Sequence, residues 1–318
     1  MMAKVYIPQA IAEEGEGFLL QQGYEVVHGS DPGPETFLRE ASSCDAILIR
    51  TQQCPGSVLE ACKSLKIVAR HGVGYDNIDT AAAEKLGIWV TNTPQALSDS
   101  VAEYTLAAIL AAAKRIPQCS RALYAGDYFY KNTHKGMDLG GKTLGIVGFG
   151  RIGRALAKKA HFGLDMRILA YSRSLRQEQA PEYVTACDLN TLLEQADVVS
   201  LHVPGGGTRS LMGEEAFARM KEGAVLVNVA RGEVVDEKAL IQALDSGRLS
   251  FAVLDVQASE PPRPEDPLLG RQDVLLTPHM ASNTEQCMAR MALHAAWQIH
   301  KVLSGLTPDW PVNHPILK

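Results

Sequence analysis

The sequence predicts an α/β protein made of two domains, each built on a doubly wound parallel sheet. Strand-like apolar runs alternate with helix-like runs from Lys4 to Asn92. The alternation returns after a glycine-rich turn near residue 148 and continues to Thr277. Such alternation is typical of parallel sheets covered by helices on both faces. At 318 residues the chain is long for one hydrophobic core and sufficient for two.

Composition and charge exclude several classes of protein. Hydrophobic residues make up 46% of the chain and charged residues 21%, which is typical of a folded globular protein. The net charge of −5, without a basic stripe, argues against nucleic acid as a partner. No apolar run approaches the roughly twenty residues of a membrane helix, and the start of the chain does not resemble a signal peptide. We therefore expect no membrane partner and a cytoplasmic location.

The six cysteines are scattered and show no C-x-x-C spacing. This pattern predicts reduced thiols rather than disulfides, and it predicts no metal site.

In the first part of the chain, strands are predicted at 5–7, 24–27, 46–49, 67–69 and 88–90. The segments after the third and fourth strands, beginning at Arg50 and at residue 70, are candidate substrate loops, because ligands bind beyond the carboxyl ends of parallel strands. A turn from Gly72 to Gly74 would present consecutive N–H groups to a carboxylate. The alternative is an ordinary strand-to-helix turn in which Asp79 caps the next helix.

A long alanine-rich helix over 98–114 is expected to carry the chain from the first domain to the second. The segment that follows, 117–142, holds Tyr124, Tyr128, Phe129 and Tyr130 with little clear period. Such an aromatic-rich segment either contacts a second subunit or packs locally.

The stretch 142–173 has the order of a dinucleotide-binding unit: strand, tight turn, helix, strand. Gly148, Gly150 and Gly153 follow an apolar run in G-x-G-x-x-G spacing and open a helix. The first glycine allows the tight turn, the second lets the backbone approach a pyrophosphate, and the third lets the helix pack on the strand. The positive end of the helix dipole would face the phosphates. This order predicts a Rossmann-like domain.

The end of the second strand of this unit bears on the choice of cofactor. An NAD site has an acidic residue there to hold the ribose 2'-hydroxyl. This chain has Ser172, Arg173 and Ser174 instead, which can hold a 2'-phosphate. The sequence therefore favours NADP over NAD, the alternative being that Arg173 is a solvated loop residue.

Further strands are predicted at 198–203, 224–228, 251–254 and 274–277, and a last helix at 283–304. Arg231, Asp255 with Glu260, and His279 follow three of these strands, so they should meet at one sheet edge. Hydride transfer to a carbonyl needs a proton partner, and a histidine beside a carboxylate suits that role. Arginine suits a substrate carboxylate. Taken singly, these side chains are also explained as a loop histidine, a solvated charge, or a partner of a nearby acid.

The chain resembles the D-isomer-specific 2-hydroxyacid dehydrogenases over essentially its full length. The resemblance rests on motifs in this order: GVGYDNID at 72–79, NTP at 92–94, VAE at 101–103, the glycine fingerprint at 148–153, VNVARGEVVDEKAL at 227–240, LDV at 254–256, EPP at 260–262 and TPH at 277–279.

The resemblance implies a catalytic trio of Arg231, Glu260 and His279, with His279 as acid and base and Glu260 as its partner. It also implies that the backbone around Val73 and Gly74 holds the substrate carboxylate.

For the cofactor, the resemblance implies that Asp255 contacts the nicotinamide amide and that Arg151 and Ile152 contact the pyrophosphate. The other implied cofactor contacts are Val203, Val229 and Ala230. It further implies a flavodoxin-like substrate domain at 1–97 and 283–318, a Rossmann-like nucleotide domain at 98–282, and a homodimer formed through the nucleotide domain.

Within the family, the likeness is to the D-3-phosphoglycerate dehydrogenase and hydroxypyruvate/glyoxylate reductase branch. Arg50 would then be a second cation for a substrate phosphate, or else a strand-end arginine exposed to water. Two departures from the family pattern are Ser172 in place of the acid and Gln95-Ala96 in place of a glycine. The expected substrate is a small 2-oxo or 2-hydroxy acid. The alternative function is a nicotinamide-sensing, corepressor-like binding protein on the same fold.

Overall fold

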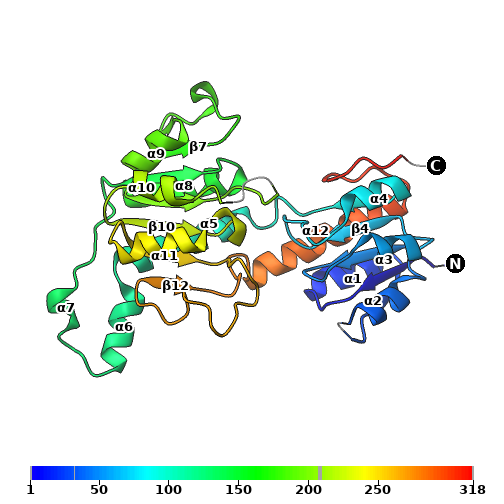
Figure 1. The fold of residues 1–318 in the computed structure, drawn as a ribbon. Coiled ribbons are helices and arrows are strands. Elements are labelled where there is room, and N and C mark those ends of the chain that lie inside the picture. The colour runs from blue at the N-terminus through cyan, green and yellow to red at the C-terminus, as the bar shows by residue number, and fades with distance from the viewer. Residues whose placement is uncertain (1, 32, 207–209, 317–318) are drawn as a thin grey trace. The chain divides into compact units, whose positions relative to one another are not determined.

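The computed structural model describes residues 2–31, 33–206 and 210–316. The chain forms two compact units, Met1–Leu97 with Asn283–Lys318, and Ser98–Ser282. Each unit contains one sheet with helices around it (Figure 1). All strand pairs in both sheets are parallel, which confirms the predicted fold class.

The first unit has a five-stranded sheet in the order β2-β1-β3-β4-β5. Its strands are β1 (Lys4–Ile7), β2 (Glu25–His28), β3 (Ala46–Ile49), β4 (Ile67–Arg70) and β5 (Trp89–Thr91). Its helices are α1 (Glu13–Gln21), α2 (Pro34–Ala41), α3 (Gly56–Ala61), α4 (Thr80–Leu86) and α12 (Glu285–Leu303). Because successive strand side chains point to opposite faces, Tyr6 packs with Phe37 of α2, while Val5 packs with Ile299 of α12.

The second unit has a seven-stranded sheet in the order β12-β11-β10-β9-β6-β7-β8. Its strands are β6 (Thr143–Val147), β7 (Arg167–Tyr171), β8 (Val184–Ala186), β9 (Val198–Leu201), β10 (Ala224–Asn228), β11 (Leu249–Leu254) and β12 (Val274–Leu276). The strand order reverses between β6 and β9. In doubly wound sheets this reversal is the point where ligands bind.

Helices cover both faces of this second sheet. They are α5 (Ser98–Ala113), α8 (Arg151–Leu164), α9 (Leu189–Gln195), α10 (Glu214–Arg219) and α11 (Glu237–Asp245). The unit also contains α6 (Ile116–Tyr124), α7 (Tyr130–Thr133) and two short 3₁₀ turns at Gln177–Gln179 and Gly232–Val234. Ile109 of α5 and Leu156 of α8 share one core with Ile146, while Leu193 of α9 and Leu240 of α11 share the other with Val147. The two faces of β6 are therefore buried equally.

Two features of the second unit differ from the sequence prediction. The short strand β8 was not predicted, since three residues carry no period. The segment after α5 forms α6 and α7, which stand away from the sheet in Figure 1. Pro117 lies in the first turn of α6, where its missing N–H group breaks no helical hydrogen bond. No helix in the described ranges is long and apolar enough to cross a membrane.

Candidate active site

The glycine turn after β6 is shaped by close backbone contacts. Gly148 has a φ of 99°, and its N–H group donates to the carbonyl oxygen of Tyr171 at 2.8 Å. A Cβ at this position would lie 2.5 Å from the carbonyl oxygen of His202, and a Cβ at Gly153 would lie 2.4 Å from that of Gly148. Neither position accepts a side chain without movement of the backbone.

Gly150 differs from these two glycines because a Cβ there would meet nothing within 4 Å. Gly150 is the N-cap of α8, and no side chain caps this helix. The first N–H groups of α8 therefore have no side-chain cap in the structure, and they lie at the positive end of the helix dipole. Arg151 is exposed and Ile152 is half-buried in this first turn. These features fit the pyrophosphate of a dinucleotide, which the second glycine of the fingerprint would let approach.

The predicted 2'-phosphate residues stand directly beside this turn. Ser172 follows Tyr171, the last residue of β7, whose carbonyl oxygen binds Gly148. Arg173 and Ser174 are exposed. Within the described part of the chain, the Arg173 side chain makes no hydrogen bond or ion pair. A guanidinium in this state is available for an anionic group of a ligand.

The remaining predicted cofactor contacts follow the next two strands. Val203 comes after β9, and its backbone nitrogen would lie 2.9 Å from a Cβ on Gly148. Val229 is half-buried and Ala230 is buried, directly after β10. The structure thus brings the ends of β6, β7, β9 and β10 together at one sheet edge.

The three predicted catalytic residues follow three adjacent strands of the same sheet. Arg231 comes after β10, Glu260 after β11 and His279 after β12. The Nδ1 atom of His279 lies 2.8 Å from Oε2 of Glu260. A Cβ at Gly232 would lie only 1.9 Å from the carbonyl oxygen of Gln257, so the Arg231 and Glu260 loops touch through their backbones.

The surroundings of Glu260 favour its charged form. Burial raises the pKa of this carboxyl, but the hydrogen bond and charge of His279, the N–H group of Gln257 and the charge of Arg231 outweigh burial. The pKa of Glu260 therefore lies below its ordinary value. Glu260 is a carboxylate at neutral pH and can only accept hydrogen bonds. The proton between Glu260 and His279 consequently sits on Nδ1 of the imidazole.

Asp255 fixes the backbone of the histidine loop. It is 1% exposed, and its carboxylate accepts hydrogen bonds from the N–H groups of Met280 at 2.9 Å and Ala281 at 2.8 Å, and from Oγ1 of Thr277 at 2.8 Å. Its carbonyl oxygen accepts the N–H group of His279 at 2.8 Å. His279 has a φ of 51°, a conformation that residues other than glycine adopt only when their surroundings impose it. The sequence did not indicate this anchoring role of Asp255.

Two further residues that support the site were missed by sequence reasoning. Asn228 is fully buried; its Nδ2 donates to the carbonyl oxygen of Arg231 and its Oδ1 accepts from Ala230. Gln257 donates from Nε2 to the carbonyl oxygens of Leu254 and Thr277 and so ties the ends of β11 and β12 together. The only available signal was a polar residue at the end of each apolar strand.

The predicted carboxylate-binding turn lies in the first unit, after β4. Thr93 accepts the N–H group of Gly72 through Oγ1 at 3.0 Å, and Asn92 donates to the carbonyl oxygen of Val73 at 2.9 Å. In the described residues, the N–H groups of Val73 and Gly74 donate to no protein acceptor. Asp79 does cap α4. The segment therefore combines the helix cap of Asp79 with two N–H groups that are available to a ligand.

Positive charge gathers beside this turn. Arg50 directly follows β3, and its Nη1 atom donates a hydrogen bond to the carbonyl oxygen of Ala10 at 2.9 Å. His71 is 3% exposed, and burial followed by the charges of Arg50 and Arg70 lowers its pKa to about 4. His71 is therefore neutral at neutral pH, and the two guanidinium groups carry the charge of this edge.

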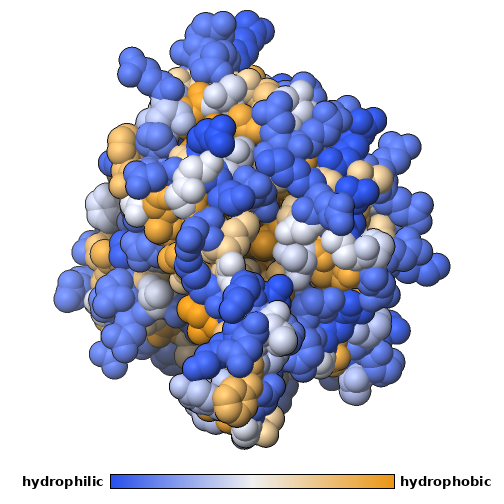
Figure 2. Space-filling model, turned by 90° about the vertical axis from the view of Figure 1, so that its left-hand side faces the viewer, coloured by the Kyte–Doolittle hydropathy of each residue, from blue (hydrophilic) through white to orange (hydrophobic). Residues whose placement is uncertain are grey.

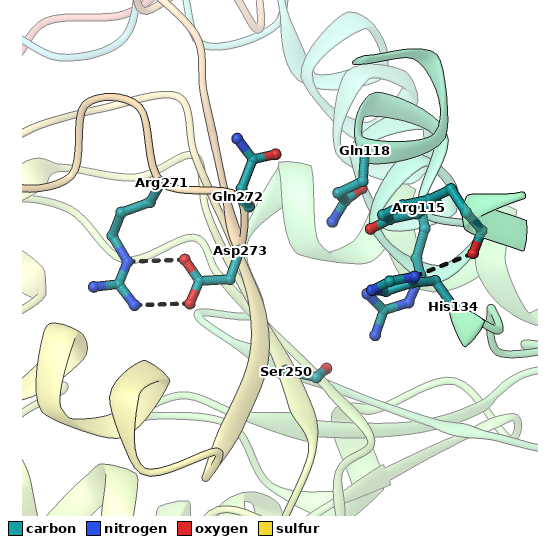
Figure 3. A pocket seen from close by; sticks show the side chains of 8 residues that line it. Arg115, Gln118, His134, Ser250, Arg271, Gln272 and Asp273 are labelled. Carbon is teal, nitrogen blue, oxygen red and sulfur yellow. Dashed lines mark hydrogen bonds and ion pairs between the residues drawn. The ribbon is translucent and has the colours of Figure 1, made fainter. Parts of the chain in front are cut away.

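A polar hollow of about 400 Å³ lies at the base of α6 and contains none of the predicted site residues. Figure 3 shows the ion pair of Arg271 and Asp273 on one side of it and Arg115 and Gln118 on the other. Ser250 and Asp273 lie at the starts of β11 and β12. The hollow is therefore at the sheet edge opposite the one that carries His279.

Paired glycine variants test where a dinucleotide binds. Gly148→Ala places a methyl group against His202 at a positive φ, so we expect it to lower the free energy of unfolding by about 2 kcal/mol. Gly150→Ala meets no protein atom and should leave stability unchanged, but it should weaken NADPH binding by about tenfold, because the methyl group would stand where the pyrophosphate approaches. Denaturant unfolding and fluorescence titration measure the two effects. Wild-type affinity in Gly150→Ala would place the pyrophosphate elsewhere.

Comparison with known proteins bears on the same residues. A family model described as the NAD-binding domain of D-isomer-specific 2-hydroxyacid dehydrogenases matches residues 106–281. The chain is 38% identical over 318 residues to a D-3-phosphoglycerate dehydrogenase of Archaeoglobus fulgidus, covering 99% of this chain and 60% of that protein. It is 39% identical over 327 residues to a glyoxylate reductase of Korarchaeum cryptofilum, covering 100% of this chain and 98% of that protein.

A solved structure gives the same result. An NADPH-dependent glyoxylate/hydroxypyruvate reductase from Sinorhizobium meliloti, in complex with NADP and malonate, superposes with a TM-score of 0.87 at 29% identity, covering 98% of this chain and 97% of that one. The chain therefore spans about three fifths of the phosphoglycerate dehydrogenase and nearly all of the two reductases. The resemblance found in the sequence is confirmed: this chain is an oxidoreductase that belongs to the D-isomer-specific 2-hydroxyacid dehydrogenase family.

Proposed function

We propose that this protein reduces a small 2-oxo acid reversibly to the D-2-hydroxy acid, with His279 as the proton donor. The observation that carries the proposal is the 2.8 Å contact between Nδ1 of His279 and Oε2 of Glu260. This contact lies at the sheet edge where the glycine turn and the end of β7 also lie.

The protein side chains divide the chemistry between them. Glu260 accepts a hydrogen bond from the Nδ1–H group of His279. The protonated imidazole then donates its Nε2 proton to the carbonyl oxygen of the substrate and is left neutral, with its remaining proton on Nδ1. Arg231 offers a guanidinium to the substrate carboxylate and polarises the carbonyl. A bound reduced nicotinamide supplies the hydride. In the reverse direction His279 takes the hydroxyl proton.

For the cofactor we propose NADP rather than NAD. The N-terminal turn of α8, with Arg151 and Ile152, would hold the pyrophosphate, and Ser172, Arg173 and Ser174 would hold the 2'-phosphate. Support comes from the unengaged Arg173 side chain, from the lack of an acid at residues 172–174, and from the NADP in the Sinorhizobium reductase. Oδ2 of Asp255 accepts one hydrogen bond in the structure, so it has capacity for the nicotinamide amide.

For the substrate we propose that residues 1–97 and 283–318 hold the acid and residues 98–282 hold the cofactor. The N–H groups of Val73 and Gly74 would bind the substrate carboxylate, and Arg50 would bind a phosphate where the substrate carries one. The relatives include both a phosphoglycerate dehydrogenase and glyoxylate reductases. The candidates are therefore 3-phosphohydroxypyruvate, hydroxypyruvate and glyoxylate.

A panel of these three oxo acids, assayed with NADPH and with NADH, tests the function. We expect turnover of at least one acid and a higher kcat/KM with NADPH. Tight NADPH binding without turnover of any oxo acid would instead support a nicotinamide-sensing protein.

Arg173→Ala tests the cofactor choice. Loss of a charge-assisted contact of about 1.5–3 kcal/mol should raise the KM for NADPH at least about tenfold and leave kcat/KM with NADH within about twofold. Lys158→Ala, which removes an exposed cation from α8 at a distance from its first turn, is the matched control and should change neither value. Equal losses with both cofactors would contradict a 2'-phosphate contact.

We also propose that the protein is a homodimer in which a second copy covers α6 and the turn to α7. The exposed fractions of Tyr124, Tyr128 and Phe129 are 89%, 61% and 70%. Figure 2 looks onto the side of the second unit from which α6 and α7 project, and apolar patches interrupt the hydrophilic surface there. Exposed apolar groups of this size are typical of interfaces.

Sedimentation velocity tests the dimer. The wild type should have the mass of two chains, and Tyr124→Ser combined with Phe129→Ser should shift it toward one. Leu20→Ser, which removes an exposed apolar side chain from α1, should have no effect. A wild-type monomer would refute the proposed dimer.

A further inference from the structure

A chain of hydroxyl groups links α5 to the loop that carries His279. The Tyr104 hydroxyl, on α5, is hydrogen-bonded to Oγ1 of Thr277, and Oγ1 of Thr277 donates to Oδ1 of Asp255 at 2.8 Å. The Tyr104 hydroxyl also interacts directly with the Asp255 carboxylate, so Tyr104, Thr277 and Asp255 form one hydrogen-bonded cluster.

Tyr104 stays protonated throughout the range in which enzymes work. Burial raises its pKa to about 12; the hydrogen bond with Thr277 lowers the pKa, and the charge and hydrogen bond of Asp255 raise it. The Tyr104 hydroxyl therefore keeps its proton and remains a hydrogen-bond donor.

The packing of the Tyr104 ring does not require the hydroxyl group. The ring is half-buried against the core shared by α5 and α8. A phenylalanine would fill that space equally well. The hydroxyl adds the bond to Thr277 and an interaction with the Asp255 carboxylate, and both help to fix the orientation of the Thr277 side chain.

The chain ends on the group that shapes the histidine loop. Besides Thr277, the Asp255 carboxylate accepts the N–H groups of Met280 and Ala281, the two residues after His279. Thr277 lies two residues before His279. Asp255 therefore holds both sides of a histidine that has a positive φ. If Thr277 were held less firmly, the backbone on the N-terminal side of His279 would be less restrained.

We propose that Tyr104 is a positioning residue for His279, acting through Thr277 and Asp255. This inference rests on the proposed function, in which His279 moves the proton. A donor chain of this kind orders the loop before substrate arrives, which matters because small displacements of a proton donor reduce turnover strongly.

Kinetics of glyoxylate reduction with NADPH test the chain. Tyr104→Phe should lower kcat about five- to tenfold with the KM for NADPH within about twofold. Thr277→Val should lower kcat at least as much, and Thr277→Ser, which restores a hydroxyl, should recover most of the loss. In the Thr277→Val background, Tyr104→Phe should cost less than it does alone, because the interaction through Thr277 is already lost. Tyr183→Phe removes a half-buried hydroxyl with no hydrogen bond in the described residues and is the matched control.

Hydrogen exchange gives a second readout that needs no cofactor or turnover. In the ligand-free protein, the amides of Met280 and Ala281 should exchange about tenfold faster in Tyr104→Phe than in the wild type, while amides in β6 should not change.

The outcomes separate this inference from the proposed function. If the wild type reduces glyoxylate and Tyr104→Phe keeps both its kcat and its slow exchange, the positioning role is wrong. The same conclusion follows if the losses in Tyr104→Phe and Thr277→Val multiply in the double variant. If the wild type reduces none of the three oxo acids, the proposed function fails, and the exchange measurement still decides whether Tyr104 orders the loop.

Discussion

The buried carboxylate of Asp255 is the interaction on which the rest of the site depends. A charged group at 1% exposure needs hydrogen-bond donors, and here Thr277, Met280 and Ala281 of the loop around His279 supply them. The carboxylate and its own carbonyl oxygen together engage the backbone of three consecutive residues, 279–281. This requirement holds a histidine in a left-handed conformation and directs Nδ1 to Glu260. The hydrogen bonds that the desolvated Asp255 carboxylate requires therefore also order His279.

Close backbone contacts fix the positions of the other loops of the site, as Asp255 fixes the loop around His279. The Arg231 and Glu260 loops approach so closely at Gly232 that no side chain fits between them. The same holds where Gly148 meets the end of β9. Parallel strands bring their carboxyl ends to one edge, but they do not fix the distance between loops. Glycines at the contacts and polar ties such as Gln257 set those distances, and so the chemistry is built from backbone as much as from side chains.

The sequence predicted the fold class, most strands and the positions of Arg231, Glu260 and His279 at strand ends, because alternation and fingerprint spacing are local patterns. It could not predict the 2.8 Å contact of Glu260 with His279, which depends on how two loops fold back. Tyr104 and Thr277 are 173 residues apart in the sequence, and a local sequence pattern does not indicate contacts over such a separation. Strand β8 and helices α6 and α7 were not predicted because they are short or irregular. Their secondary structure depends on tertiary packing rather than on a local hydrophobic periodicity.

Replacement of the histidine tests the central claim most directly, namely that His279 is the proton donor and that the surrounding hydrogen bonds serve to hold it. We predict that His279→Ala lowers kcat for oxo-acid reduction by about a thousandfold and leaves NADPH affinity within about twofold. Asp255 would still bind residues 280 and 281 in this variant, so the fold should persist. A variant that kept a near-normal rate would contradict the account.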